Sequence, residues 1–146
     1  PEHFVRNKVF LEILLKKYIK FQNFTIDKNE NNLDSMLESK YLITDYSGIA
    51  IEYLLGLNKP VIYFDKYPKI HNENYKDIQE DTIEDDVKKL FGISVNDPDI
   101  ENLEDYLIMS EKKIDNNLQL IENYTKENFF NLNNSINYTF NLFKDR

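Results

Sequence analysis

Residues 41–65 decide the fold, and they read Tyr41-Leu-Ile-Thr-Asp45-Tyr-Ser47-Gly48-Ile-Ala-Ile-Glu52-Tyr-Leu-Leu-Gly56-Leu-Asn-Lys59-Pro60-Val-Ile-Tyr-Phe-Asp65. The pattern is strand, tight turn, helix and strand, with small polar residues where the first strand becomes the helix. In parallel sheets the first turn of such a helix offers free N–H groups and the positive end of the helix dipole. Ligands therefore bind at this point, and an anion such as a nucleotide diphosphate is the natural guest.

The boundaries inside this stretch follow from its residue types. Tyr41 to Thr44 has little polarity, as expected for a strand covered on both faces, and Val61 to Phe64 is a second apolar run opened by a proline. The helix between them spans roughly Gly48 to Leu55, with Ser47 or Asp45 as its cap. Gly56 suits a left-handed exit from its C-terminus.

The rest of the chain alternates in the same way, which predicts an α/β fold: a Rossmann-like parallel sheet flanked by helices. The spacing of apolar residues predicts a first amphipathic helix with a broad buried face. The expected helices are Phe4–Ile19, Leu33–Leu37, Ile83–Leu90, Ile100–Ile108 capped by Asp99, Lys113–Phe130 and Ile136–Phe143; the other strands are Phe21–Ile26 and Ile93–Val95; loops cover Asp27–Asn32 and Lys66–Asp81.

Length and composition narrow the class of protein. A chain of 146 residues with 10 Tyr and 10 Phe is long enough for one domain with a real core, residues 1–146. The formal net charge of −8 argues against a partner of the nucleic-acid class, and Glu80–Asp86 indicates a solvated loop or a helix start. The absence of cysteine excludes disulfides and thiolate metal sites, and no cofactor or metal is expected. The sequence shows no apolar run of about 18 residues and no signal peptide.

Two other placements of the motif fit less well. The strand Leu-Ile-Thr-Asp45 resembles the strand of a receiver domain that carries the phosphorylated aspartate. Such a domain also needs an acidic pair after its first strand and a Lys-Pro after a later one, whereas Lys59-Pro60 precedes a strand here. A Walker-type phosphate loop is excluded because the chain has no Gly-x-x-x-x-Gly-Lys.

The third placement is a family resemblance. Thr44-Asp45-Tyr46-Ser47-Gly48, an acidic residue at Glu52 and Lys59-Pro60 before a hydrophobic strand resemble the C-terminal half of the CDP-glycerol glycerophosphotransferase family. These are teichoic-acid primases and polymerases with two Rossmann-like halves in a GT-B arrangement. Gly48 replaces the second serine of their pattern and Glu52 replaces an aspartate, so one hydroxyl donor is lost and the charge is kept. The resemblance is strongest over Leu33 to Asp65.

The resemblance implies a reaction and a role for these residues. The family transfers glycerol phosphate from CDP-glycerol to an acceptor hydroxyl of a cell-wall or capsule polymer and releases CMP. Ser47 and the N–H groups of Gly48 and Ile49 would hold the diphosphate, and Glu52 would accept hydrogen bonds from ribose hydroxyls. Asp45 would shape the turn or contact the ligand, and Asp65 lies at the ligand side of its strand. The general base lies in the family's N-terminal half, so this chain is expected to bind without turnover.

The same resemblance suggests that the chain is a piece of a longer two-domain protein. Pro1 would be the proline of the family's His-Pro pair, whereas His3 stands in the wrong order and is taken as a surface residue. The implied partners are a nucleotide-diphosphate donor, a polymer or lipid-linked acceptor and the N-terminal domain. The implied location is cytoplasmic, with contact to the inner membrane face through parts outside this chain.

Plainer interpretations stand beside each role. Ser47 can be a helix cap, Asp45 a turn former, Glu52 and Lys59 surface residues, and Asp65 a loop cap. His71, in a polar loop, is a further candidate for substrate contact. Two other functions remain open: a GT-B glycosyltransferase or epimerase that uses a nucleotide sugar, and a non-catalytic α/β binding module that keeps the turn for structure.

Overall fold

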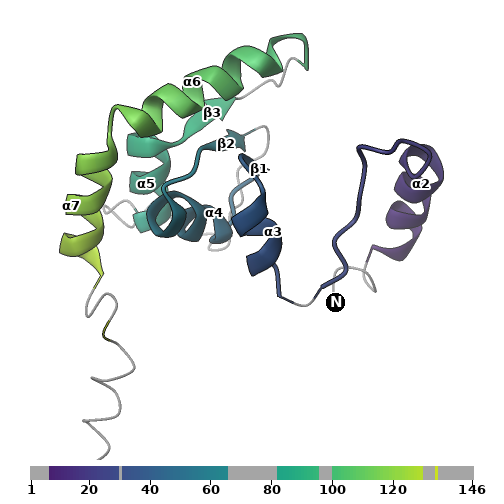
Figure 1. The fold of residues 1–146 in the computed structure, drawn as a ribbon, viewed down its shortest axis with the longest axis horizontal. Coiled ribbons are helices and arrows are strands. Elements are labelled where there is room, and N and C mark those ends of the chain that lie inside the picture. The colour runs from purple at the N-terminus through teal and green to yellow at the C-terminus, as the bar shows by residue number, and fades with distance from the viewer. Residues whose placement is uncertain (1–6, 30, 66–81, 96–99, 130–133, 135–146) are drawn as a thin grey trace, which may run out of the picture. The chain divides into compact units, whose positions relative to one another are not determined.

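A computed structural model describes residues 7–29, 31–65, 82–95, 100–129 and 134 (Figure 1). Backbone proximity divides the chain into two compact units, Pro1–Ser39 and Lys40–Arg146. The prediction of one domain over residues 1–146 stays a prediction. Several predicted features lie outside the described residues: the roles of Pro1, His3 and His71, the cap at Asp99, and the helix Ile136–Phe143.

The first unit contains helices α2 (Lys8–Tyr18) and α3 (Leu33–Glu38), close to where the sequence predicts helices. The broad buried face expected on the first helix is wrong, because no residue of α2 is buried and Val9 and Phe10 are 72% and 62% exposed. The reason is that α3, the other described helix of this unit, has only six residues and cannot cover so wide an apolar stripe.

The strand predicted at Phe21–Ile26 is also wrong. The N–H of Phe21 bonds to the carbonyl of Tyr18 at 2.9 Å, and the N–H of Phe24 bonds to the carbonyl of Phe21 at 3.2 Å. Both aromatic rings pack on the ring of Tyr18, with centroid distances of 6.3 Å and 5.5 Å. Local turns and aromatic contacts therefore use the backbone donors and the side chains that a strand would have needed.

The second unit is built on a parallel sheet of three strands, β1 (Leu42–Thr44), β2 (Val61–Phe64) and β3 (Ile93–Val95), in the order β1-β2-β3. Ile43 lies opposite Ile62 in the first pair, and Ile62 lies opposite Ile93 in the second. The central strand is the most buried, as its continuous apolar run predicts. The predicted α/β class with a Rossmann-like parallel sheet is confirmed.

Helices flank this sheet (Figure 1). Their bounds are α4 (Ile49–Ile51), the π-helical segment η1 (Glu52–Gly56), α5 (Ile83–Phe91), the 3₁₀ turn η3 (Ile100–Asn102), α6 (Leu103–Asp115) and α7 (Leu118–Asn128). The sequence predicts one helix that ends at Ile108 and a next one that begins at Lys113. This boundary is wrong, because α6 continues to Asp115. The break comes at Asn117, whose side-chain amide donates to the carbonyl of Lys113 at 2.7 Å and whose N–H donates to Ile114 at 2.9 Å.

The core of the second unit joins the sheet to these helices. On α5, Val87 and Phe91 are four residues apart and both are buried, so they lie on one face of the helix. The ring of Phe91 meets that of Tyr124 on α7 edge to face at 5.7 Å. The other fully buried side chains come from the η1 segment, the central strand, α6 and α7: Tyr53, Leu54, Val61, Ile62, Ser110 and Ile121.

Lys113 ties α6 to the end of α5. Its ammonium group donates to the carbonyl of Gly92 at 2.6 Å and to that of Lys89 at 3.1 Å. Carbonyls at a helix C-terminus carry partial negative charge and lack intrahelical donors, so a cation is favourable there. Burial lowers the pKa of Lys113. This lysine therefore fixes the position of the residues that enter β3.

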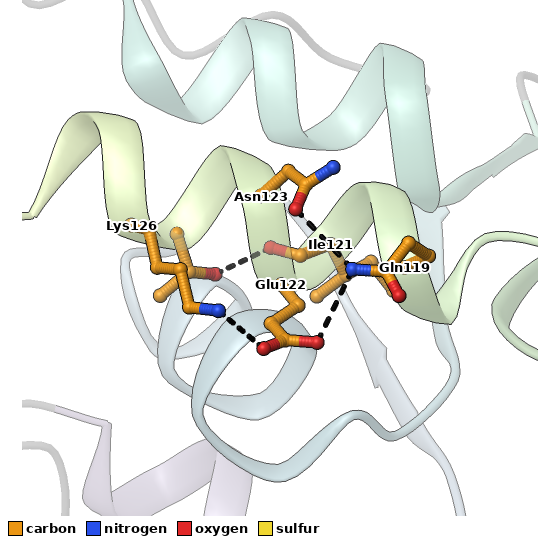
Figure 2. Close-up of polar contacts among 6 residues, drawn as sticks. Gln119, Ile121, Glu122, Asn123 and Lys126 are labelled. Atoms are coloured by element: carbon orange, nitrogen blue, oxygen red, sulfur yellow. Dashed lines mark hydrogen bonds and ion pairs between the residues drawn. The ribbon is translucent and has the colours of Figure 1, made fainter.

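One face of α7 carries polar contacts of a solvated helix surface (Figure 2). The side-chain amide of Gln119 donates to Glu122 and to Asn123, each at 3.3 Å, and Lys126 pairs with Glu122. The hydrogen bond from Lys126 lowers the pKa of Glu122. The hydroxyl of Thr125, on the buried side, donates a hydrogen bond to the carbonyl of Ile121 at 2.7 Å. These groups are satisfied within the helix.

In the part of the chain that the structure covers, no helix is both long and apolar enough to cross a membrane.

The exit from η1 corrects the prediction for Gly56. Its φ is not positive, and the residue with positive φ is Asn58, at 52°. The N–H of Lys59, beyond the end of the π-helical segment, bonds back to the carbonyl of Tyr53 at 3.2 Å. After the wider turn, the left-handed residue that ends the helix lies at Asn58, two residues after Gly56. Asparagine tolerates the left-handed conformation better than most residues with a side chain.

This geometry predicts opposite effects for two substitutions at Asn58. Asn58→Ala is expected to lower the free energy of unfolding by about 1 kcal/mol, because alanine is strained at positive φ. Asn58→Gly should leave that free energy unchanged or raise it slightly. Urea unfolding of the three proteins, followed by circular dichroism, measures the difference. Equal stability of the alanine and glycine variants would show that the left-handed conformation is not required at this position.

Candidate functional site

The predicted site residues gather at the carboxyl edge of the sheet. Asp45 follows β1 directly, and Asp65 follows β2 directly. Because the two strands are parallel neighbours, both aspartates lie at the same edge. Ser47 and Gly48 complete the connection from β1 to α4. The structure thus brings together the residues that the sequence singled out, on the side of a parallel sheet where ligands bind.

The turn from β1 into α4 leaves backbone donors available. The carbonyls of Ser47 and Gly48 accept the N–H groups of Ala50 and Ile51, at 3.1 Å and 3.0 Å. No described residue accepts a hydrogen bond from the N–H of Gly48 or of Ile49. Such orphan donors at the start of a helix are the groups that bind anions.

The predicted side-chain cap is wrong. Neither Ser47 nor Asp45 makes a capping hydrogen bond to α4. The cause lies in the backbone: Gly48, which precedes the helix, is itself helical, with φ −59° and ψ −26°, whereas a capping residue normally has extended geometry that aims its oxygen at the first turn. The hydroxyl of Ser47 is therefore not occupied by the helix.

Glu52 lies on the exposed side of the same helical segment, at the first position of η1. The next three residues, Tyr53 to Leu55, are all buried and fix the segment against the core. No described residue forms an ion pair with Glu52. A carboxylate on a rigid segment, four residues after Gly48, is free to accept hydrogen bonds from a ligand.

Asp65, in contrast, already has a partner. Its N–H bonds to the carbonyl of Val95 at 3.0 Å, and its carboxylate oxygen lies 2.7 Å from the ammonium nitrogen of Lys88 on α5. The two side chains are 17% and 19% exposed. Nothing in the sequence points to Lys88, because a lysine in an amphipathic helix is ordinarily a surface residue.

Two tyrosines complete the group around this ion pair. The Lys88 nitrogen lies 5.8 Å from the ring centre of Tyr46 and 5.6 Å from that of Tyr63, within the range of cation–π attraction. Burial, and then the proximity of Asp65 and Tyr46, raises the pKa of Tyr63, so its hydroxyl stays protonated. The Thr-Asp-Tyr-Ser motif contains Tyr46, which is the one signal that could have pointed to this arrangement.

Tyr46 also links the motif to the start of α5. Its hydroxyl lies 2.9 Å from the hydroxyl oxygen of Thr82, the cap residue of α5, which accepts the N–H of Asp85 at 3.2 Å. The acidic residues that follow Thr82 occupy the first turn of α5, so the described part of the acidic segment is the helix start that the sequence predicts. Negative charge there stabilises the helix through its dipole.

An open cavity of about 360 Å³ lies at the opposite, amino edge of the sheet. Lys40 lines it just before β1 and pairs with Glu111 of α6, which also accepts the hydroxyl of Tyr41 at 2.5 Å. The hydrogen bond with Glu111 raises the pKa of Lys40 to about 12, and that from Lys40 lowers the pKa of Glu111. Lys59 also lines this cavity and lies over the ring of Tyr53 at 5.7 Å. These contacts join α6 to the sheet at the edge away from Ser47.

A comparison with protein families identifies the family of the chain. Residues 14–135 match the model of a family described as CDP-Glycerol:Poly(glycerophosphate) glycerophosphotransferase. The match covers most of the chain, including all three strands, and confirms the resemblance inferred from the motif. No curated protein and no solved structure matches the chain significantly.

Proposed function

The chain belongs to the CDP-glycerol:poly(glycerophosphate) glycerophosphotransferase family, a family of transferases, and we propose that it binds the CDP-activated donor of this reaction. The donor is CDP-glycerol or a related CDP-activated polyol, and the acceptor is a hydroxyl of a cell-wall or capsule polymer or of a lipid-linked primer. The observation that carries this proposal is the pair of unoccupied N–H groups, on Gly48 and Ile49, at the carboxyl edge of a parallel sheet.

These donors fit the diphosphate of the ligand. Phosphate oxygens accept hydrogen bonds from backbone N–H groups at a helix start, and the free hydroxyl of Ser47 adds a third donor. The carboxylate of Glu52 suits the ribose hydroxyls, because it is exposed on the same segment and lacks a protein partner among the described residues. The exposed carboxylate of Asp45, at the end of β1, contacts the ligand or shapes the turn.

The reaction needs no covalent intermediate with the enzyme. The acceptor oxygen attacks the glycerol-bearing phosphorus, the bond from that phosphorus to the bridging oxygen breaks, and CMP leaves with the bridging oxygen. Catalysis then depends on orientation and on donors that stabilise charge on the equatorial oxygens. The acceptor proton goes to a base that we place in an N-terminal domain of the same protein, in a GT-B arrangement. On this proposal the present chain binds donor at the cytoplasmic membrane face without completing transfer.

Ser47→Ala tests the proposal. We expect the Kd for CDP-glycerol and for CDP to rise about ten- to a hundredfold, since a hydrogen bond to a charged group contributes about 1.5–3 kcal/mol and 1.4 kcal/mol is tenfold in affinity. The free energy of unfolding should stay within about 0.5 kcal/mol, because the side chain caps no helix. Calorimetric titration and urea unfolding measure the two quantities.

Ser94→Ala is the matched control, since Ser94 is an exposed serine of β3. Its CDP affinity should equal that of the unmodified chain. Preference for UDP-N-acetylglucosamine over the cytidine ligands would instead favour a nucleotide-sugar glycosyltransferase. If the folded protein bound none of these nucleotides, the non-catalytic α/β binding module would be the remaining function.

A further inference from the structure

The ion pair between Asp65 and Lys88 lies at the same sheet edge as the proposed donor site. The backbone of Asp65 is fixed by its hydrogen bond to β3, so its carboxylate cannot move far from the end of β2. Within the described ranges, the structure gives the ammonium group of Lys88 one oxygen partner, this carboxylate at 2.7 Å. An ammonium group has three donors, which leaves capacity for further acceptors.

The surroundings keep this cation close to the motif. The faces of Tyr46 and Tyr63 lie on it, and Tyr46 is the residue directly before Ser47. The hydroxyl contact of Tyr46 with Thr82 holds α5, which carries Lys88, against the turn. About a fifth of the lysine side chain is exposed, so a small anion has access to it from solvent.

A diphosphate is a stronger partner for this cation than Asp65 is. It carries more negative charge than one carboxylate and offers several acceptor oxygens, and lysine binds phosphate as a mobile point charge. We propose that Lys88 is the cation that binds the donor diphosphate and that Asp65 is its counterion in the empty site. Asp65 then acts through Lys88 and does not contact the donor. This inference rests on the proposed function for the location of the diphosphate.

Charge-removing variants of the 146-residue chain test this assignment. We expect Lys88→Gln to raise the Kd for CDP and for inorganic pyrophosphate about tenfold and to leave the Kd for cytidine unchanged. Lys89→Gln is the matched control: the neighbouring lysine is exposed on the same helix, so the net charge changes equally and the affinities should stay within twofold. Asp65→Asn should tighten pyrophosphate binding severalfold, because the carboxylate no longer competes for Lys88.

Folding is controlled with a double variant. Lys88→Gln leaves Asp65 partly buried without its cation, whereas Lys88→Gln with Asp65→Asn removes both charges and keeps two amides that can bond to each other. The free energy of unfolding of this double variant should be close to that of the unmodified chain. Its pyrophosphate binding should be as weak as that of Lys88→Gln. Equal weakening by Lys88→Gln and Lys89→Gln would overturn the assignment of Lys88. Weaker binding by a folded Asp65→Asn chain would overturn the counterion role.

The probes separate this inference from the proposed function. Binding of CDP-glycerol that does not depend on Lys88 would overturn the inference alone. Pyrophosphate binding that depends on Lys88, without preference for CDP-glycerol, would support the inference and overturn the donor assignment. Absence of binding to both probes would overturn the two together.

Discussion

Replacing Phe91 with alanine is expected to lower the free energy of unfolding by about 3–5 kcal/mol. The Phe91 side chain is 1% exposed, lies beside Val87 on the buried face of α5 and packs edge to face on Tyr124 of α7. Removing the ring takes away its burial and leaves a cavity between the two helices. Domains of this size are stable by about 5–15 kcal/mol, so the loss is a large fraction of the total. The melting temperature should fall by on the order of 10 °C.

Leu90→Ala provides the control for this substitution. Leu90 is the preceding residue of the same helix and is 41% exposed. Its truncation also removes hydrocarbon, though a smaller group than a phenyl ring, from a position that solvent already reaches, so the expected loss is within about 1 kcal/mol. Similar losses for the two variants would contradict the packing of α5 described above.

Gly92→Ala is the second large effect, with an expected loss of about 3 kcal/mol in the free energy of unfolding. A Cβ at Gly92 would lie 2.3 Å and 2.8 Å from two ring carbons of Tyr63 and 3.1 Å from the carbonyl of Lys88. The φ of Gly92 is −87°, which any residue adopts, so the cost is purely steric. Tyr63 is 3% exposed and the carbonyl belongs to the helix backbone, so neither neighbour can move aside easily.

The matched control is Gly56→Ala. Nothing lies within 4 Å of a Cβ at Gly56, so alanine should leave stability unchanged or raise it by up to about 1 kcal/mol. A second check uses Tyr63→Leu, which removes the ring that alanine at position 92 would strike. In that background the cost of Gly92→Ala should fall by more than half. A cost that stays the same would place its origin elsewhere than in contact with Tyr63.

The sheet could be predicted from the sequence with little error. Leu42–Thr44, Val61–Phe64 and Ile93–Val95 are short runs with few polar residues, bounded by turn residues such as Pro60 and Gly92. The continuous apolar run of β2 fits its burial, and short connections with helices between the strands require parallel pairing. The expectation that the first strand is covered on both faces is wrong, because Ile43 is 42% exposed. The start of α5 lies where the sequence predicts a helix, at Ile83, within the acidic segment Glu80–Asp86.

The errors arose where two local preferences compete. Phe21–Ile26 has strand-forming residues, yet its aromatic rings gain more from Tyr18 than from an exposed ladder. Gly56 satisfies the usual rule for a helix end, but the π-helical turn shifts the reversal to Asn58, and nothing in the sequence marks that wider turn. Such choices depend on tertiary contacts that a single sequence does not display.

The candidate site could also be predicted only where local sequence decides the structure. The motif predicted where Ser47, Gly48 and Glu52 lie, because these positions depend on a local strand-to-helix turn. The partner of Asp65 could not be predicted, since Lys88 comes from the next helix and reaches the carboxylate only after β2 and α5 have packed. From the sequence alone, Asp65 therefore resembles an independent ligand contact.

The parallel sheet also sets the order in which the chain can fold. Leu42 pairs with Val61 and Ile62 pairs with Ile93, so each strand pair closes a long loop that contains a helix. No hairpin can nucleate these contacts, and such non-local topologies fold more slowly than helical bundles do. β2 is the common partner of both pairs. Among the described strands, β1 therefore has no partner during synthesis until residue 64 has emerged, and the three-stranded sheet is complete only after Val95.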